Sequence, residues 1–148
     1  MHFSLAYYSN ALHPFNEEAL FDLAEQASLI NKSHDVTGFL QYRNNHFFQY
    51  LEGKREQVLL IGNNISQDSR HSIQWMVHLP LIEVRRFSDW YMRYITPQEI
   101  KSLQLESLLD ENWMEVEASE GQEDILKRSS LQLIVRIADV YPQQGYLY

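Results

Sequence analysis

The stretch VTGFLQYRNNHFFQYLEG, residues 36–53, contains two apolar-rich runs on either side of a short polar turn. Residues 36–42 and 46–51 are rich in β-branched and aromatic side chains, which are typical of strands. The polar residues 43–46 between them leave room only for a tight connection. The stretch therefore predicts an antiparallel hairpin at the centre of the fold.

The sequence on both sides of this hairpin predicts further strands and helices. Residues 2–8 alternate as a strand, with residues 10–14 as a loop, and Asn16 is suited to cap a helix that should end in the polar stretch 31–35. A second helix is expected over 55–67 and two more strands over 73–79 and 89–95. The order β-α-β-β-α-β-β indicates an α+β protein: a ferredoxin-like, five-stranded mixed sheet with two helices on one face.

The rest of the chain is predicted to be mainly helical. Thr96, Pro97 and Glu99 form the pattern of a capping box. Residues 106–124 contain eight acidic residues and no Lys or Arg, and they read as a solvated acidic connection. Ser119 or Gln122 would cap a last helix that Pro142 ends. We expect these helices to cover the other face of the sheet.

Composition limits the classes of function. The net charge is −8 with a pI near 5.1, which argues against a nucleic-acid partner and against adhesion to anionic membranes. The chain has no Cys, no signal peptide and no apolar run long enough to cross a bilayer, so a cytoplasmic protein is expected. Its five Gly residues do not cluster and its six His residues lack metal-ligand spacing, which disfavours a small hydrolase or a metal site.

Five residues are candidates for a site, and each has a plainer interpretation. Gln49 shares a strand face with apolar residues, so a buried amide there needs a polar partner, unless the position is at an edge. Tyr7 could supply a hydroxyl or be an ordinary core tyrosine. Asn31 could face a ligand or end its helix in a left-handed conformation. Trp90 and Met92 share one face of the last predicted strand and could simply be core residues.

Together these residues resemble the BLUF family of blue-light sensors that use flavin. The matching motifs are Leu5-x-Tyr7-x-Ser9, then 36–40, 48–53, Asp68-Ser69-Arg70-His71 and 87–92. The resemblance covers roughly residues 2–95. We therefore expect a flavin-binding domain over 1–95 and a helical extension packed on the sheet over 96–148. The Tyr-x-Ser spacing favours Tyr7 over Tyr8 as the key tyrosine.

The resemblance implies a photoreceptor rather than an enzyme. It would hold an oxidised flavin non-covalently, either FAD or, alternatively, FMN or riboflavin. The implied flavin contacts are Tyr7, Asn31, Gln49, Asp68 and His71, and the implied photoswitch is Tyr7, Gln49, Trp90 and Met92. Light would drive proton-coupled electron transfer from Tyr7 to the flavin, followed by rearrangement of the Gln49 hydrogen bonds.

The resemblance leaves the output open. Ala27, Ser28 and Asn64 depart from the family pattern near the expected ribityl and phosphate end of the ligand, which puts phosphate contacts in doubt. The predicted output is altered binding to another protein, for example a transcriptional regulator, or altered self-association. The alternative is a non-photoactive ferredoxin-like module for protein interaction.

Overall fold

The structure is a computed structural model, and it describes residues 1–141 of the 148. The strands are β1 (His2–Ala11), β2 (Thr37–Arg43), β3 (His46–Gly53), β4 (His71–Ile82) and β5 (Arg93–Ile95). The helices are α1 (Glu17–Ser33), α2 (Arg55–Ser66), α3 (Pro97–Ser102), α4 (Glu106–Ala118) and α5 (Glu123–Val140). The predicted role of Pro142 lies outside the described residues.

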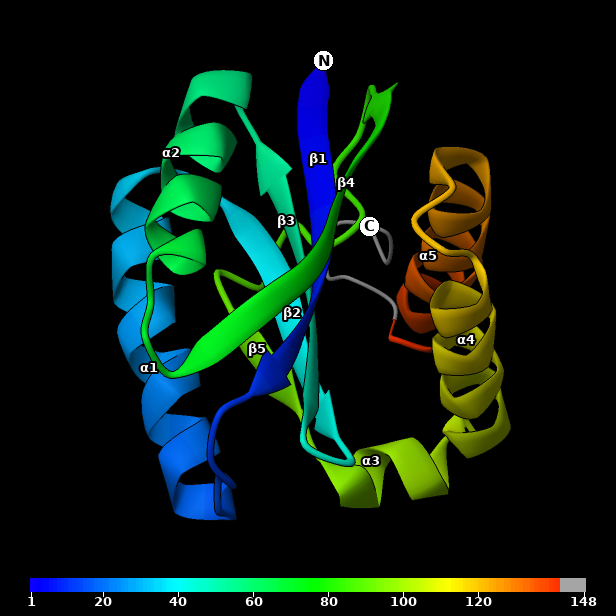
Figure 1. Ribbon diagram of the computed structural model, residues 1–148. Helices are drawn as coiled ribbons and strands as arrows, with labels where there is room; N and C mark the ends of the chain where they lie inside the picture. The colour runs from blue at the N-terminus through cyan, green and yellow to red at the C-terminus, as the bar shows by residue number, and fades with distance from the viewer. Residues whose placement is uncertain (142–148) are drawn as a thin grey trace.

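The five strands form one mixed sheet in the order β4-β1-β3-β2-β5. All neighbouring strands are antiparallel except β2 and β5, which are parallel. In Figure 1, α1 and α2 cover one face of the sheet, and α4 and α5 lie on the other side. This arrangement confirms the predicted α+β, ferredoxin-like fold, with C-terminal helices on the second face. Within the described residues, no helix is both long and apolar enough to cross a membrane.

Strand β1 divides the core into two clusters because successive side chains of a strand point to opposite faces. Tyr7 belongs to the cluster beneath α1 and α2, together with Leu5, Leu40 and Leu51. Tyr8 belongs to the cluster beneath α4 and α5. Two neighbouring residues of one central strand therefore reach two separate interiors.

Helix α1 begins and ends where the sequence predicts. The Asn16 side chain accepts a hydrogen bond from the Ala19 amide at 2.8 Å, as an N-cap should. The helix continues to Ser33, and the left-handed residue is Asp35, with a φ of 53°. The helix thus ends within the predicted range 31–35, but the alternative in which Asn31 itself ends it in a left-handed conformation is wrong, because Asn31 lies within the helix and is buried.

The strands differ from the prediction mainly at their ends. β1 extends into the predicted loop as far as Ala11, and β4 is longer than predicted at both ends. Strand β4 tolerates Pro80 because it lies at an edge of the sheet, where a missing amide breaks no ladder. The predicted strand over 89–95 is wrong in its first half, since β5 contains only Arg93–Ile95.

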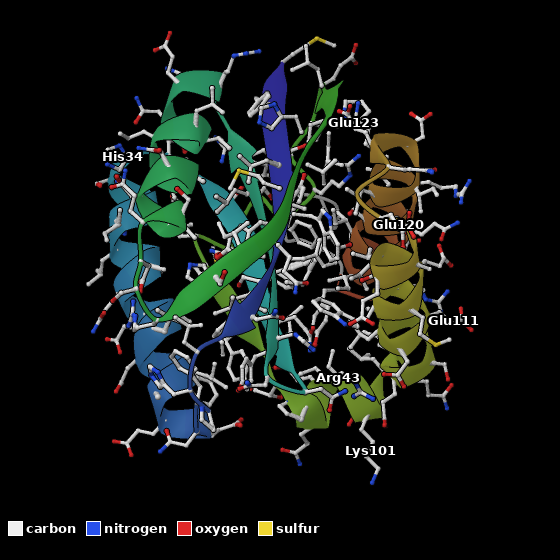
Figure 2. All side chains as sticks on the ribbon, in the orientation of Figure 1. His34, Arg43, Lys101, Glu111, Glu120 and Glu123 are labelled. Carbon is white, nitrogen blue, oxygen red and sulfur yellow. The ribbon has the colours of Figure 1, made fainter. Side chains whose placement is uncertain are left out.

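The acidic segment is not an open connection, because most of it forms helix α4. Leu109, Asn112 and Val116 recur at helical spacing and are buried against the sheet side. The acidic residues occupy the remaining exposed positions, and Figure 2 shows Glu111 on the outer surface of this helix. Gln122 is the N-cap of α5 but makes no capping hydrogen bond, whereas the capping box predicted at Thr96 and Glu99 is confirmed.

Candidate functional site

A cavity of about 220 Å³ lies between α1, α2 and the sheet. This volume is far larger than the roughly 10–15 Å³ that one water molecule needs. Its walls are mainly apolar and come from both helices and from β2 and β3: Leu23, Ala27, Ile30, Leu40, Phe47, Ile61 and Ile65. The cavity therefore suits a flat, largely apolar ligand.

Tyr7 and Gln49 lie directly opposite each other on neighbouring strands β1 and β3, and both line this cavity. Tyr7 is 3% exposed and Gln49 is 5% exposed. Burial raises the pKa of the Tyr7 hydroxyl far above its ordinary value, and the nearby negative charge of Asp68 raises that pKa further. The Tyr7 hydroxyl is therefore firmly protonated at neutral pH.

Hydrogen bonding leaves one end of the Gln49 amide free. Its Nε2 donates to the sulfur of Met92 at 3.4 Å, and sulfur is a weak acceptor. Within residues 1–141, neither the Gln49 Oε1 atom nor the Tyr7 hydroxyl has a hydrogen-bond partner. These two buried strand residues thus offer one acceptor and one hydroxyl to whatever fills the cavity.

Asn31 adds a third polar group from α1. Its Nδ2 donates to the Tyr91 carbonyl at 2.7 Å, so the side chain is fixed in orientation. Asn31 is 2% exposed and lines the cavity, and its Oδ1 has no partner in the described part of the chain. The Asn31 side chain can therefore accept a hydrogen bond from the edge of a ligand.

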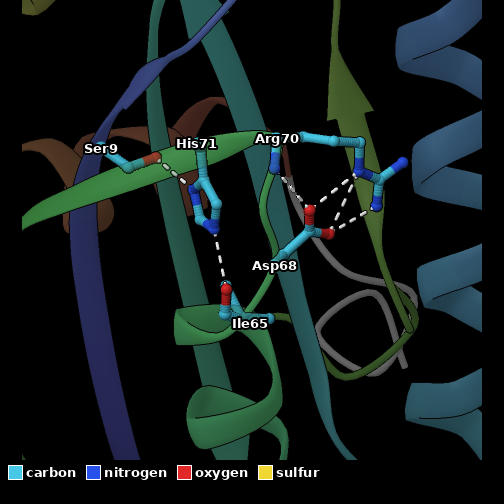
Figure 3. Close-up of polar contacts among 5 residues, drawn as sticks. All are labelled: Ser9, Ile65, Asp68, Arg70 and His71. Carbon is cyan, nitrogen blue, oxygen red and sulfur yellow. Dashed lines mark hydrogen bonds and ion pairs between the residues drawn. The ribbon is translucent and has the colours of Figure 1, made fainter.

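The turn that follows α2 contributes a charged pair that lines the cavity, and Figure 3 shows its contacts. The Arg70 guanidinium contacts the Asp68 carboxylate at 2.6 Å, and the Arg70 amide donates to Asp68 at 2.9 Å. The hydrogen bond from Arg70 is the main cause that lowers the pKa of Asp68 to about 2. Asp68 is thus ionised at any physiological pH.

His71 is held between β1 and the end of α2, as Figure 3 shows. Its Nε2 lies 2.8 Å from the Ile65 carbonyl, and its Nδ1 lies 2.7 Å from the Ser9 hydroxyl. A carbonyl can only accept, so Nε2 carries a hydrogen, and in a neutral ring Nδ1 accepts from Ser9. The His71 ring also packs edge-on against Tyr7, with centroids 5.8 Å apart.

Trp90 lies away from these groups, which corrects the prediction that it shares a strand face with Met92. Its ring stacks on Phe87 at 5.1 Å in the cluster beneath α4 and α5, and the Arg93 guanidinium lies over it. Met92 packs in the other cluster and contacts Gln49. The two side chains diverge because Trp90 and Met92 precede β5 instead of alternating within it.

The cavity also contains a polar residue, Gln26, that the sequence analysis missed. Helical spacing could have found it, because Gln26 lies on the face of α1 that also carries Leu23, Ala27 and Ile30. Asn64 of α2 and Arg70 line the cavity too, and the sequence names them only as a departure from the family pattern and as part of a motif.

The fold and the cavity define a small α+β ligand-binding domain whose buried polar groups face one pocket. The model of the BLUF family, described as sensors of blue-light using FAD, matches residues 3–93. The chain belongs to the BLUF family, and flavin is therefore its cofactor.

Relatives of known sequence match this part of the chain. The blue light- and temperature-regulated antirepressor BluF of Escherichia coli (strain K12) is 42% identical over 62 residues, which are 40% of this chain and 15% of that protein. Photoactivated adenylate cyclase subunit alpha of Euglena gracilis is 35% identical over 91 residues, which are 60% of this chain and 9% of that protein. The chain thus spans less than a fifth of the length of these relatives.

Solved structures match a larger share of the chain. The dark-state structure of BlrB, a BLUF protein, has a TM-score of 0.67 at 27% identity and covers 95% of this chain and 97% of its own. The ground state of BlsA has a TM-score of 0.56 at 31% identity and covers 72% of this chain and 73% of its own. The match to BlrB therefore includes most of the C-terminal helices as well as the sheet.

The residues that line the cavity fit a flavin. The apolar side chains of both helices can enclose a flat ring, and the free Oε1, Oδ1 and hydroxyl groups can meet its polar edge. The fit is poorer for a phosphate tail. Among the lining residues, Arg70 is the only Lys or Arg, and its guanidinium is already paired with Asp68.

Proposed function

We propose that this BLUF chain is a blue-light switch in which Tyr7 and Gln49 respond to the excited flavin and alter the binding of another protein. One observation carries this proposal. Tyr7 and Gln49 are cross-strand neighbours, both side chains are buried, and each keeps a polar atom that has no partner within the described residues and lies at the same cavity. Polar atoms that converge on a mainly apolar cavity in this way are suited to orient a ligand.

Tyr7 is the proposed donor. A bound flavin, when excited by blue light, supplies a strong one-electron oxidant. The high pKa of the Tyr7 hydroxyl keeps its proton in place in the dark. Loss of an electron makes a phenol strongly acidic, so the proton must leave Tyr7 Oη together with the electron. Gln49 is the residue directly opposite and is suited to receive or pass on that proton.

Gln49 is the proposed switch. Its amide has a donor end and an acceptor end, so rotation or tautomerisation exchanges the groups that it presents without moving β3. The present orientation is held by a single weak hydrogen bond to Met92. A second orientation would lose only this bond and would direct Nε2–H toward the ligand instead. Two arrangements of similar free energy are what a reversible switch requires.

The other polar residues have proposed binding roles. Asn31 would accept from the ring edge through Oδ1, since its Nδ2 is already bound to the Tyr91 carbonyl. Asp68 and His71 would border the ligand at the end of α2, and Asp68 would also hold Arg70 in place. The lack of an unpaired basic residue at the cavity supports ring recognition more than phosphate recognition, so FMN and riboflavin stay alternatives to FAD.

The output is proposed to pass to the C-terminal helices, which we treat as an extension over 96–148 of the domain over 1–95. Tyr8, the neighbour of Tyr7 in β1, is linked to both α4 and α5 by buried hydrogen bonds to Asn112 and Ser130. No enzymatic step is assigned to these helices. The proposed effect of light is therefore changed contact with a regulatory protein or with a second copy of the chain.

Absorption spectroscopy tests the proposal. The purified protein should be yellow, and blue light should shift its absorption reversibly to longer wavelength by a small step. Gln49→Leu removes both amide ends while it keeps the volume, so the variant should bind flavin and lose the shift. Protein that stays colourless with added flavin would favour the ligandless interaction module, and a normal shift in Gln49→Leu would remove Gln49 from the mechanism.

A further inference from the structure

Glu52 is a fully buried carboxylate, 0% exposed, at the end of β3 and three residues after Gln49. Burial of a charged group is costly unless hydrogen bonds replace its water. Each Glu52 oxygen accepts two hydrogen bonds: Oε1 from the Tyr50 hydroxyl at 2.8 Å and the Arg86 amide at 2.9 Å, and Oε2 from the Thr37 hydroxyl at 3.1 Å and the Phe87 amide at 2.7 Å. The carboxylate is therefore held from four directions.

Two cations stand one hydrogen bond away from this carboxylate. An Arg86 guanidinium nitrogen donates to the Tyr50 hydroxyl at 3.0 Å, and an Arg85 guanidinium nitrogen donates to the Thr37 hydroxyl at 3.1 Å. Each hydroxyl therefore accepts from an arginine and donates to Glu52. A network in which every member is satisfied in this way fixes the position of its parts.

The part that Glu52 fixes is the irregular segment 86–92, which forms most of the connection between β4 and β5. Its backbone amides at Arg86 and Phe87 bind Glu52 at one end. Further along, the Trp90 carbonyl accepts from the Gly38 amide at 2.7 Å, and the Tyr91 carbonyl accepts from Asn31 at 2.7 Å. The segment ends at Met92, whose sulfur meets the Gln49 amide.

We propose that Glu52 is a positioning residue of the photoswitch, because it anchors segment 86–92 and so sets the Met92 sulfur against the Gln49 amide. The proposal rests on the proposed function of Gln49. Gly38 belongs to the same arrangement, since a Cβ atom there would lie 1.8 Å from the Tyr50 carbonyl oxygen and would displace the strand that carries both Gln49 and Glu52. Glu52 itself is not among the residues that line the cavity.

Glu52→Gln tests this role in the flavin-loaded protein. The substitution replaces one accepting oxygen by an NH2 group, which must face a donor, so the anchor loosens at one end. In the dark, hydrogen exchange of a peptide spanning 86–92 should become about tenfold faster or more, while exchange in β1 stays unchanged. Unchanged exchange in 86–92 would overturn the proposal, whether or not the protein responds to light.

A double-mutant cycle tests the link to the switch. In the otherwise native chain, Met92→Leu removes the sulfur and should change the rate constant of dark recovery by about threefold or more. In the Glu52→Gln background the same substitution should change that rate constant by less than about 1.5-fold, because the contact between Met92 and Gln49 is already displaced. Additive effects, or no effect of Met92→Leu alone, would contradict the proposal. A native chain that binds flavin but shows no light-induced shift would contradict the proposed function instead. The hydrogen-exchange experiment would then still test whether Glu52 anchors segment 86–92.

Two further variants serve as a substitute for Glu52→Gln and as a control. Tyr50→Phe removes one of the four hydrogen bonds and keeps the ring, so it should show the same pattern in weaker form if Glu52→Gln does not fold. Tyr8→Phe is the matched control. It breaks a buried network on the same face of the sheet as Glu52, and in the part of the chain that the structure describes this network has no hydrogen bond to segment 86–92. The effect of Met92→Leu should survive intact in the Tyr8→Phe background, and its loss there would show general loosening and overturn the specific role of Glu52.

Discussion

Tyr7 and Tyr8 are neighbours in β1, yet their hydroxyl groups have opposite surroundings. The Tyr7 hydroxyl lies at the cavity and has no partner within the described residues. The Tyr8 hydroxyl accepts from Asn112 at 3.0 Å and lies 2.9 Å from the Ser130 hydroxyl. Burial raises the pKa of both, that of Tyr8 to about 12. A tyrosine hydroxyl thus lacks a hydrogen-bond partner among the described residues on one face of the sheet and has two partners on the other.

The difference extends beyond the two tyrosines. On the cavity face, Asn31 and Gln49 each bind protein through one end of the amide and leave the other end free. On the opposite face, Asn112 donates to Tyr8 and to Ser129, which ties α4 to α5 and to β1. Ser4 Oγ is the one buried side-chain polar atom of the described residues with no partner and no access to a surface. The polar groups of the cavity face therefore have room for a ligand's hydrogen bonds, whereas the Tyr8–Asn112–Ser129–Ser130 network is complete by itself and Ser4 Oγ, on the same face as Tyr8, is the exception there.

The largest expected effect separates the two tyrosines by photochemistry. Tyr7→Phe removes the proposed donor, so the variant should keep flavin and lose the normal light-induced shift entirely. Tyr8→Phe leaves the cavity unaltered and should keep the shift. Absorption spectra before and after blue light, taken on both variants, measure this difference. If Tyr8 proves essential and Tyr7 does not, the assignment of the two faces is wrong.

An intermediate effect is expected on stability, where Tyr8→Phe should have the larger effect and Tyr7→Phe the smaller one. Tyr8→Phe leaves Ser130 without its buried partner and removes one acceptor from Asn112, which should lower the free energy of unfolding by about 1–3 kcal/mol. Tyr7→Phe breaks no hydrogen bond among residues 1–141 and should cost less. Urea titrations of the native chain and both variants in the dark give the comparison. Equal losses would show that the Tyr8 network adds little beyond packing.

The sequence is a good guide to the regular parts of this fold. The hairpin over 36–53, the cap at Asn16 and the capping box at Thr96 depend on neighbouring residues, and all three are found. Residues 106–124 are wrongly predicted as an open connection, because that prediction rests on their charge and not on the spacing of their apolar residues. Leu109, Asn112 and Val116 mark a helical face among the acidic residues.

The candidate site is less accessible from sequence, because its geometry depends on single long-range contacts. Trp90 and Met92 look like alternating strand residues, but Gly38 and Asn31 bind the backbone of this segment and direct the two side chains to opposite sides of the sheet. No local pattern signals a partner that is 50 or 60 residues away. The five flavin contacts that the motif resemblance implies all line the cavity, but the motifs do not reveal which of their atoms stay free.

The smallest expected effect concerns the charged rim of the cavity face, and it depends on pH. The pKa of Asp68 is about 2 in the folded protein, below the value of about 3.9 for an unfolded chain. Asp68 therefore binds protons more weakly when folded, so its contribution to stability is full above about pH 4–5 and is lost as pH falls toward 2. Both side chains of the pair with Arg70 are partly exposed, which limits the contribution to about 0.2–1 kcal/mol.

Asp68→Asn tests this contribution, because it removes the charge and keeps an acceptor for the Arg70 amide. The native chain should be more stable than the variant at pH 6 in low salt, and the difference should shrink toward zero near pH 2. Added salt should reduce the difference at pH 6, because the pair is reached by solvent. Denaturant titrations at several pH values measure it. If the stability difference between the native chain and Asp68→Asn stays constant from pH 6 to 2, packing rather than the charge of Asp68 stabilises this rim. The rim would then resemble the network around Tyr8, which is held by uncharged groups.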